Sequence, residues 1–301
     1  MKAASEMLTG GRVGAALNRL IEAVERQESL DAISAPVASV VQAATKSATV
    51  KNLLSGPWLG HQLHPVLTDL PIGFWTSALV LDVAGGQDSE KAADMMVAMG
   101  NLSALGAAAS GLADWSDLYG GPQRSGLVHA ATNAVALTLF GLSSAARMAG
   151  SRRAGRALAM AGWGTVSAAA YIGGHLVYRR GSGVTHAGFE IDEELSDWHH
   201  AGAAADLTDG QPKKVNVDGA DILLFKQGGS ILALASTCGH AGGPLHEGEF
   251  ADGAVTCPWH GSRFALVDGC VLRGPASMPQ PAFETRVHEG KVEVRAKTGQ
   301  Q

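Results

Sequence analysis

Two short, glycine-rich segments hold the residues best suited to metal chemistry. The first, TCGHAGGPL at residues 237–245, contains Cys238 and His240, and the second, TCPWHGSRF at residues 256–264, contains Cys257 and His260. Two thiolates and two imidazoles can occupy the four outer positions of a [2Fe-2S] cluster, with the cysteines on one iron and the histidines on the other. Tetrahedral zinc also accepts two sulfurs and two nitrogens, but zinc loops usually pair like ligands, whereas each loop here supplies one ligand of each kind. The spacing therefore favours an iron-sulfur cluster over zinc.

Residues from about 202 to 296 resemble a Rieske domain through these two motifs. The resemblance implies that Cys238, His240, Cys257 and His260 ligate the cluster, and that the glycines and prolines around them wrap it. It also implies that electrons enter and leave through the two histidines. The short alternating apolar runs after residue 213 are typical of hairpins and suit an all-β domain.

Departures from the respiratory members of that family bear on the reduction potential. Those members carry a further cysteine in each loop, and the matching positions here hold Gly243 and Trp259. They also place a tyrosine hydroxyl near a ligand sulfur, where this chain has Phe264. Fewer hydrogen bonds to sulfur stabilise the reduced cluster less, so we expect a potential toward the lower part of the Rieske range of roughly −150 to +300 mV. The domain thus resembles the ferredoxin kind.

Length and composition indicate two domains in different environments. The chain has 301 residues, of which 46% are hydrophobic but only 5% aromatic, and it contains 39 glycines. Abundant small residues suit close helix packing in lipid. A formal net charge of −5 and the lack of a basic patch interleaved with aromatic residues exclude a nucleic-acid partner. With two of its three cysteines assigned to metal, the chain is expected in a reducing compartment without a disulfide framework.

Apolar residues concentrate in four segments, each near the length of about 20 residues that crosses a bilayer as a helix. They run over residues 66–84, 92–113, 127–146 and 157–177. We therefore predict a four-helix transmembrane domain over residues 57–178. A soluble bundle with buried helices is the alternative, supported by the high alanine content and by Asp69, Asp82 and Asp94.

Ionisable residues gather at one predicted membrane face. In a chain of hairpins, the first and third spans start at this face, and the second and fourth spans end there. These residues are His61, His64, Asp114, Asp117, His129 and His175. His129 and His175 could ligate a b-type haem, or could bind a quinone together with His64 and Asp69. The third interpretation is that they form hydrogen bonds with backbone groups at the helix ends.

The stretch HPVLTDLPIG, at residues 64–73, resembles the opening of a family of four-span bacterial membrane proteins of unknown function. That resemblance covers roughly residues 57–178 and implies a fold but no reaction. The remaining boundaries are an amino-terminal helical and polar segment at 1–56, a linker at 179–201, the Rieske domain at 202–296 and a tail at 297–301. Basic residues are balanced at the two predicted membrane faces, so the charge rule does not set the orientation. We place both termini in the cytoplasm because the long polar start of the chain shows no signal peptide.

These features predict a multidomain protein of the cell membrane, with a multi-pass helical bundle and a cytoplasmic all-β iron-sulfur domain. The expected function is single-electron transfer within an oxidoreductase system, with membrane lipid and a redox protein, either a reductase or an oxygenase, as partners. No catalytic residue is assigned. A quinone- or haem-linked membrane oxidoreductase and a redox or iron sensor without turnover are the alternatives.

Overall fold

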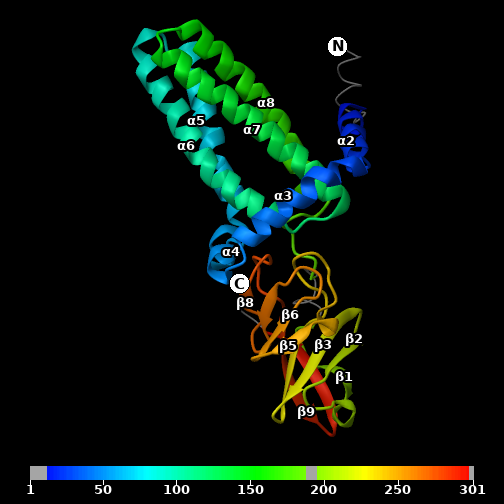
Figure 1. The fold of residues 1–301 in the computed structure, drawn as a ribbon. Coiled ribbons are helices and arrows are strands. Elements are labelled where there is room, and N and C mark those ends of the chain that lie inside the picture. Colours follow the sequence, from blue (N-terminus) through cyan, green and yellow to red (C-terminus); the bar gives the residue numbers. More distant parts are fainter. Residues whose placement is uncertain (1–11, 188–194, 298–301) are drawn as a thin grey trace. The chain divides into compact units, whose positions relative to one another are not determined.

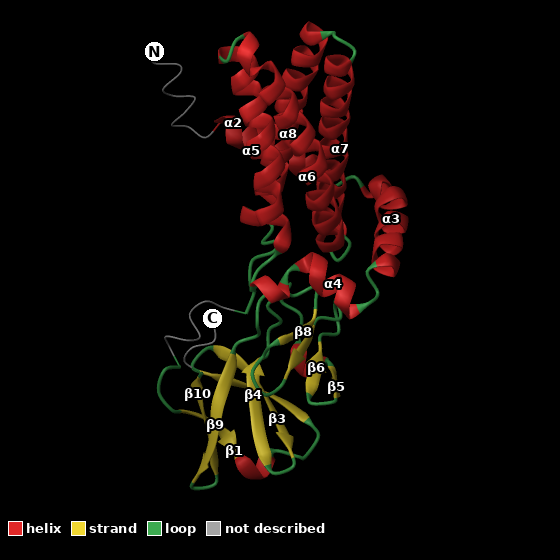
Figure 2. Cartoon of the chain, turned by 90° about the vertical axis from the view of Figure 1, so that its left-hand side faces the viewer, coloured by secondary structure: helices red, strands yellow, loops and turns green. Residues whose placement is uncertain are grey.

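The computed structural model describes residues 12–187 and 195–297 (Figure 1). The chain divides into two compact units, one formed by residues 1–44 and 64–182 and the other by residues 45–63 and 183–301. The first unit is helical and the second holds the strands (Figure 2). Residues 45–63 thus belong with the strands, whereas the sequence-based boundaries assigned them to an amino-terminal segment and to the bundle.

In its described part, which starts at residue 12, the helical unit contains two amino-terminal helices followed by four long ones. Its elements are α2 (Arg12–Glu25), η1 (Glu28–Leu30), α3 (Asp31–Ala44), α5 (Leu63–Ala84), η3 (Gln87–Ser89), α6 (Glu90–Trp115), α7 (Gly120–Met148) and α8 (Arg152–Tyr178). Three segments of the described chain, 63–84, 87–115 and 120–148, are long and apolar enough to cross a membrane. Helix α8 has comparable length but is not among these candidates. The structure therefore supports three of the four predicted spans.

The α5–α6 and α7–α8 hairpins repeat the same packing. The ring of Trp75 on α5 lies against Gly100 on α6, and the ring of Phe140 on α7 lies against Gly162 on α8. The two rings stack on each other with centroids 4.1 Å apart and planes inclined by 6°. At both glycines an added Cβ atom would lie within 3 Å of a ring carbon, so only glycine admits this approach. The hairpins therefore meet through an aromatic pair in the core of the bundle.

A network of arginines and carboxylates lies at the bundle end formed by the α5–α6 and α7–α8 turns. Arg147 pairs with Asp82 and with Asp94, and the side chains of Arg147 and Asp82 are 2% and 4% exposed. Arg152 and Arg156 pair with Asp82 as well. Two of the three aspartates that favoured a soluble bundle are thus neutralised by arginine, which removes much of the cost of placing them in an apolar helix.

Over residues 45–63, 183–187 and 195–297, the second unit contains two antiparallel sheets, which confirms the prediction of an all-β domain. The first sheet has the strand order β1-β10-β9-β4-β3-β2 and the second β5-β6-β7-β8. The strands of the first are β1 (His199–Ala203), β2 (Pro212–Val217), β3 (Ala220–Gln227), β4 (Ser230–Ala235), β9 (Ala282–His288) and β10 (Lys291–Ala296). Those of the second are β5 (Glu249–Ala251), β6 (Ala254–Thr256), β7 (Arg263–Ala265) and β8 (Val271–Arg273). Short helices complete the unit: α4 (Ala48–Ser55), η2 (Pro57–Leu59), η4 (Ala204–Asp206) and η5 (Leu245–Glu247).

Two apolar clusters form the core of this unit. One lies within the six-stranded sheet, and the other joins that sheet to the second one and includes Cys238 and Cys257 among buried leucine, valine and phenylalanine side chains. The two motif loops leave β4 and β6 at this second cluster. The cysteines are therefore anchored in the core, while the loops that carry them extend from the ends of strands.

Candidate metal centre

The two motif loops share one backbone design. The amide of Cys238 donates to the carbonyl of Gly243, and the amide of Cys257 donates to that of Ser262, each over 2.8 Å. Within each loop a glycine amide donates back to the cysteine carbonyl, Gly242 over 2.9 Å and Gly261 over 3.1 Å. These two glycines have φ angles of 80° and 71°, in the left-handed region that favours glycine. Two loops separated in sequence thus form matching turns around their cysteines.

The side chains of the four predicted ligands meet as two like pairs. The Nδ1 atoms of His240 and His260 are 3.2 Å apart, with the rings nearly perpendicular at 82°. The side chains of Cys238 and Cys257 form a hydrogen bond with each other, and the two residues are 1% and 2% exposed. Each loop contributes one member to each pair. The structure therefore brings all four residues together, sulfur with sulfur and nitrogen with nitrogen.

This pairing fits a two-metal cluster better than one ion. Two nitrogens about 2.1 Å from the same metal and 3.2 Å from each other subtend about 100° at it, which is within the range of tetrahedral coordination. Within residues 12–187 and 195–297, however, no three His, Cys, Asp or Glu side chains converge on a single ion position. A mononuclear zinc site needs four ligands around one point, whereas each iron of a [2Fe-2S] cluster takes only two from the protein.

Hydrogen bonds from backbone amides and between the two thiols act on the cysteine sulfurs. The amides of His240 and Ala241 donate to the sulfur of Cys238, and those of Trp259 and His260 donate to the sulfur of Cys257. The hydrogen bond from the Cys238 thiol lowers the pKa of Cys257 to about 6 and raises the pKa of Cys238. The thiolate is the form that binds metal. The amides can stabilise negative charge on both sulfurs.

The imidazole of His240 is held neutral. Burial, together with the neighbouring His260, lowers the pKa of His240 to about 3. A neutral ring keeps a lone pair for a metal at physiological pH. Both histidines are partly exposed while both cysteines are buried, so the nitrogen side of the site lies nearer to solvent. That gradient agrees with electron exchange through the histidines.

A glutamine that the sequence did not single out supports the first loop. The side chain of Gln280 is fully buried, its Oε1 accepts a hydrogen bond from the amide of Gly239 over 2.9 Å, and its Nε2 donates to the carbonyls of Ala235 and Thr237. Its three hydrogen bonds tie the end of β4 and the first ligand loop to the segment before β9. A lone glutamine 41 residues from its partner carries no local pattern that would reveal this role.

The positions that replace the family's extra cysteines are neighbours. A Cβ atom on Gly243 would lie 2.7 Å from the sulfur of Cys257 and 3.1 Å from the ring of Trp259. The indole therefore covers the backbone of Gly243 at the place where a bridge between the loops would lie. Phe264 is fully buried in the same core, and the hydroxyl of Ser262 accepts a hydrogen bond from the amide of Ala276 over 3.0 Å.

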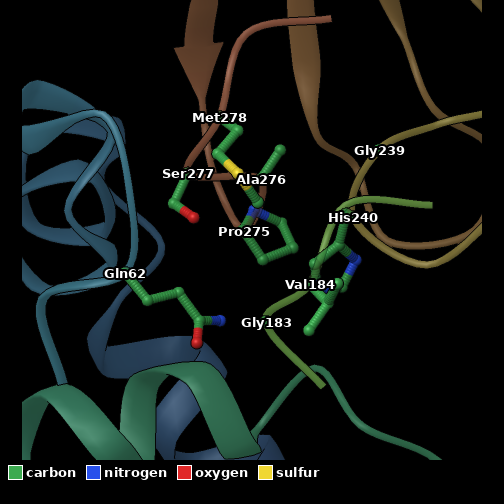
Figure 3. A pocket seen from close by; sticks show the side chains of 9 residues that line it. All are labelled: Gln62, Gly183, Val184, Gly239, His240, Pro275, Ala276, Ser277 and Met278. Atoms are coloured by element: carbon green, nitrogen blue, oxygen red, sulfur yellow. The ribbon is translucent and has the colours of Figure 1, made fainter. Parts of the chain in front are cut away.

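A small pocket opens beside His240 (Figure 3). Pro275 and Gln62 face it from other segments of the same unit. The remaining lining residues are Gly183, Val184, Gly239, Ala276, Ser277 and Met278. The pocket thus joins the first ligand loop to the loop that precedes β9 and to the segment 45–63.

The three bundle histidines do not form one group. His64 and His129 occupy equivalent places in the two hairpins: each Nδ1 donates to a backbone carbonyl of the next helix, that of Ala107 over 2.9 Å and that of Ala169 over 2.8 Å. Each ring also lies against a glycine four residues beyond that carbonyl, and the two imidazoles interact electrostatically. The haem interpretation paired His129 with His175 instead.

His175 lies in a different environment. Its Nε2 is 3.3 Å from a carboxylate oxygen of Glu25, and its Nδ1 is 3.4 Å from the side-chain oxygen of Asn18, both on α2. Glu25 also pairs with Arg180. His175 therefore joins α8 to the amino-terminal helix.

Comparison with known proteins agrees with both halves of the chain. Residues 197–284 match the family described as Rieske [2Fe-2S] domain, and residues 60–186 match that described as predicted membrane protein (DUF2231). The chain is 33% identical over 98 residues to ferredoxin CarAc of Metapseudomonas resinovorans, which covers 32% of this chain and 92% of the ferredoxin. It is 35% identical over 91 residues to apoptosis-inducing factor 3 of Mus musculus, which covers 30% of this chain but only 15% of that protein.

Among solved structures, the ferredoxin of carbazole 1,9a-dioxygenase from Nocardioides aromaticivorans IC177 aligns with 27% identity and a TM-score of 0.31, covering 33% of this chain and 96% of that one.

The fold and the paired loops define an iron-sulfur domain of the ferredoxin type joined to a domain of long apolar helices. Through its carboxy-terminal domain the chain belongs to the Rieske [2Fe-2S] family, and its helical part matches the DUF2231 membrane family. A [2Fe-2S] cluster is the cofactor that this membership implies. The ferredoxin relatives support electron transfer as the role of the domain.

Proposed function

We propose that this protein is a membrane-anchored carrier of single electrons, with Cys238, His240, Cys257 and His260 as the ligands of its [2Fe-2S] cluster. The observation that carries the proposal is the pairing of two sulfurs and two nitrogens by matched loops. A bound cluster supplies a one-electron couple. The chain's own residues hold it through the buried cysteines, stabilise charge on the sulfurs through four backbone amides, and present the partly exposed histidines to a redox partner.

The long helices provide the anchor in this proposal. We assign α8 as a fourth span beside the three apolar candidates, which gives a multi-pass protein of the cell membrane with both termini in the cytoplasm. Tethering the cluster domain raises its effective concentration near a membrane partner without any new contact. Reporter fusions at residues 86, 119, 150 and 181 test the topology: four spans place 119 and 181 on one side and 86 and 150 on the other. A reporter at 181 on the same side as 150 would refute the fourth span.

The proposed partner is a soluble or membrane redox protein, either a reductase that supplies electrons or an oxygenase that accepts them. The name of one relative, the ferredoxin subunit of anthranilate 1,2-dioxygenase from Burkholderia cepacia, attaches this kind of domain to a dioxygenase system. The experiment is anaerobic reduction of the purified protein in detergent by a pyridine-nucleotide reductase, followed by absorption spectroscopy and transfer to an acceptor. Steady turnover supports the carrier. Redox-dependent binding of a partner without turnover would support the sensor instead.

A second candidate role concerns the bundle. Each of His64 and His129 carries its proton on Nδ1, because that atom faces a carbonyl that can only accept, so Nε2 of each ring holds the lone pair. In His129 this lone pair accepts a hydrogen bond from Nδ2 of Asn133 over 3.1 Å, which a bound haem or quinone would have to replace. We propose this pair as the place where the bundle would bind a quinone or a haem, with His175 outside it. Protein purified after growth with haem supplied should show a Soret band for haem, or should be reduced by quinol for a quinone site. Failure of both would leave the histidines as tethers between helices.

A further inference from the structure

A side chain of helix α4 bonds to the backbone of β8 and of the residue that follows this strand. The side-chain amide of Asn52 donates to the carbonyl of Leu272 over 3.0 Å and accepts from the amide of Gly274 over 2.9 Å. Both partners lie more than 200 residues away in sequence. The contact therefore fixes a segment of the amino-terminal part of the chain against a loop of the iron-sulfur domain.

That loop borders the nitrogen side of the metal centre. Ala276 and Ser277 are 3% and 4% exposed, and together with Pro275 they line the pocket beside His240 (Figure 3). The amide of Ala276 also bonds to the hydroxyl of Ser262 in the second ligand loop. Through this loop, α4 contacts the immediate surroundings of the cluster ligands.

Lys51 is the neighbour of Asn52 on α4 and is only 3% exposed, although lysine is rarely buried. Its Cγ atom lies 3.6 Å from the position that a Cβ atom on Gly274 would occupy, so its stem runs along the same loop. The lysine charge acts on His240. A buried cation is poorly screened by salt and solvent, so its field reaches further than that of a surface lysine.

We propose that Lys51 provides a fixed positive charge that raises the reduction potential of the cluster. The inference rests on the proposed function, because it needs a cluster at the paired loops. Reduction adds one electron and thus one negative charge at the centre, and a nearby cation stabilises the reduced state more than the oxidised state. The amino-terminal segment would then tune the domain to its donor or acceptor.

The test is a redox titration of the full-length protein in detergent, followed by absorption, with three variants. K51M should lower the equilibrium constant for reduction about tenfold, which corresponds to 59 mV for a one-electron couple. K51R keeps the charge and should stay close to the wild type. K46M removes an exposed lysine two residues before the start of α4, and should leave the potential unchanged.

The outcomes separate this inference from the proposed function. An unchanged potential in K51M with a native cluster spectrum would overturn it, as would an equal fall in K51R, which would show that shape and not charge matters. If K51M fails to bind a cluster, K51Q is measured in its place. If K51M and K51Q both lack the cluster while K51R binds it, the role of Lys51 is purely structural and the inference is overturned. A wild type without a [2Fe-2S] spectrum would refute the proposed function itself.

Discussion

Replacing Gln280 by leucine removes the support of the first ligand loop. Leucine has a similar size but no polar atoms, so the substitution leaves the amide of Gly239 and the carbonyls of Ala235 and Thr237 without their partner. Each buried polar group that loses its hydrogen bond lowers the free energy of unfolding by about 1 to 3 kcal/mol. Because three such groups are affected and each can relax in part, we expect a total decrease of about 3 to 6 kcal/mol. The exposed Gln227, at the turn between β3 and β4, provides the control Q227L, with an expected change within about 0.5 kcal/mol.

The assay is urea unfolding of both variants in detergent, monitored by the visible absorption of the cluster. Q280L should shift the midpoint to much lower urea, while Q227L should superimpose on the wild type. Q280E is an informative intermediate, because it keeps the acceptor for Gly239 and loses the donor for the two carbonyls. A fall of less than about 1 kcal/mol in Q280L would refute the idea that this side chain holds the loop.

Three further substitutions test other parts of the structure. G243A places a Cβ atom 2.7 Å from the sulfur of Cys257, so it should reduce the iron content of the purified protein and weaken folding by about 1 to 3 kcal/mol. H260C should retain a cluster but lower its potential in a redox titration, since a thiolate replaces a neutral ligand; an unchanged potential would count against the assigned ligation. R147M leaves a buried carboxylate on α5 undercompensated and should lower thermal stability in detergent by about 2 kcal/mol or more, whereas R153M, at an exposed site, should not.

The iron-sulfur half of the protein could be predicted well because its signals are local. Each loop of this site keeps its ligands within four residues of each other, and the glycines that turn the chain lie in the same short motifs. The alternating apolar runs after residue 213 likewise report the faces of single strands. The family pattern placed Gly243 and Trp259 at matching positions of the two loops, and in the structure these two residues are neighbours.

What the sequence did not reveal depends on contacts between distant segments. Asn52 bonds to Gly274 across 222 positions, so nothing near residue 52 indicates that it belongs to the β unit. The two hairpins repeat the same ring-to-glycine contacts, although their sequences differ. His64 and Trp75, which make these contacts in the first hairpin, are eleven residues apart, and so are His129 and Phe140 in the second.

The central claim is that the paired loops hold two irons with sulfur ligands on one and nitrogen ligands on the other. The most direct measurement is the iron and acid-labile sulfide content of anaerobically purified protein, together with the electron paramagnetic resonance spectrum after reduction. We expect two irons and two sulfides for each chain and the signal of a reduced [2Fe-2S] cluster with mixed ligands. Stoichiometric zinc without sulfide, and no signal after reduction, would contradict it.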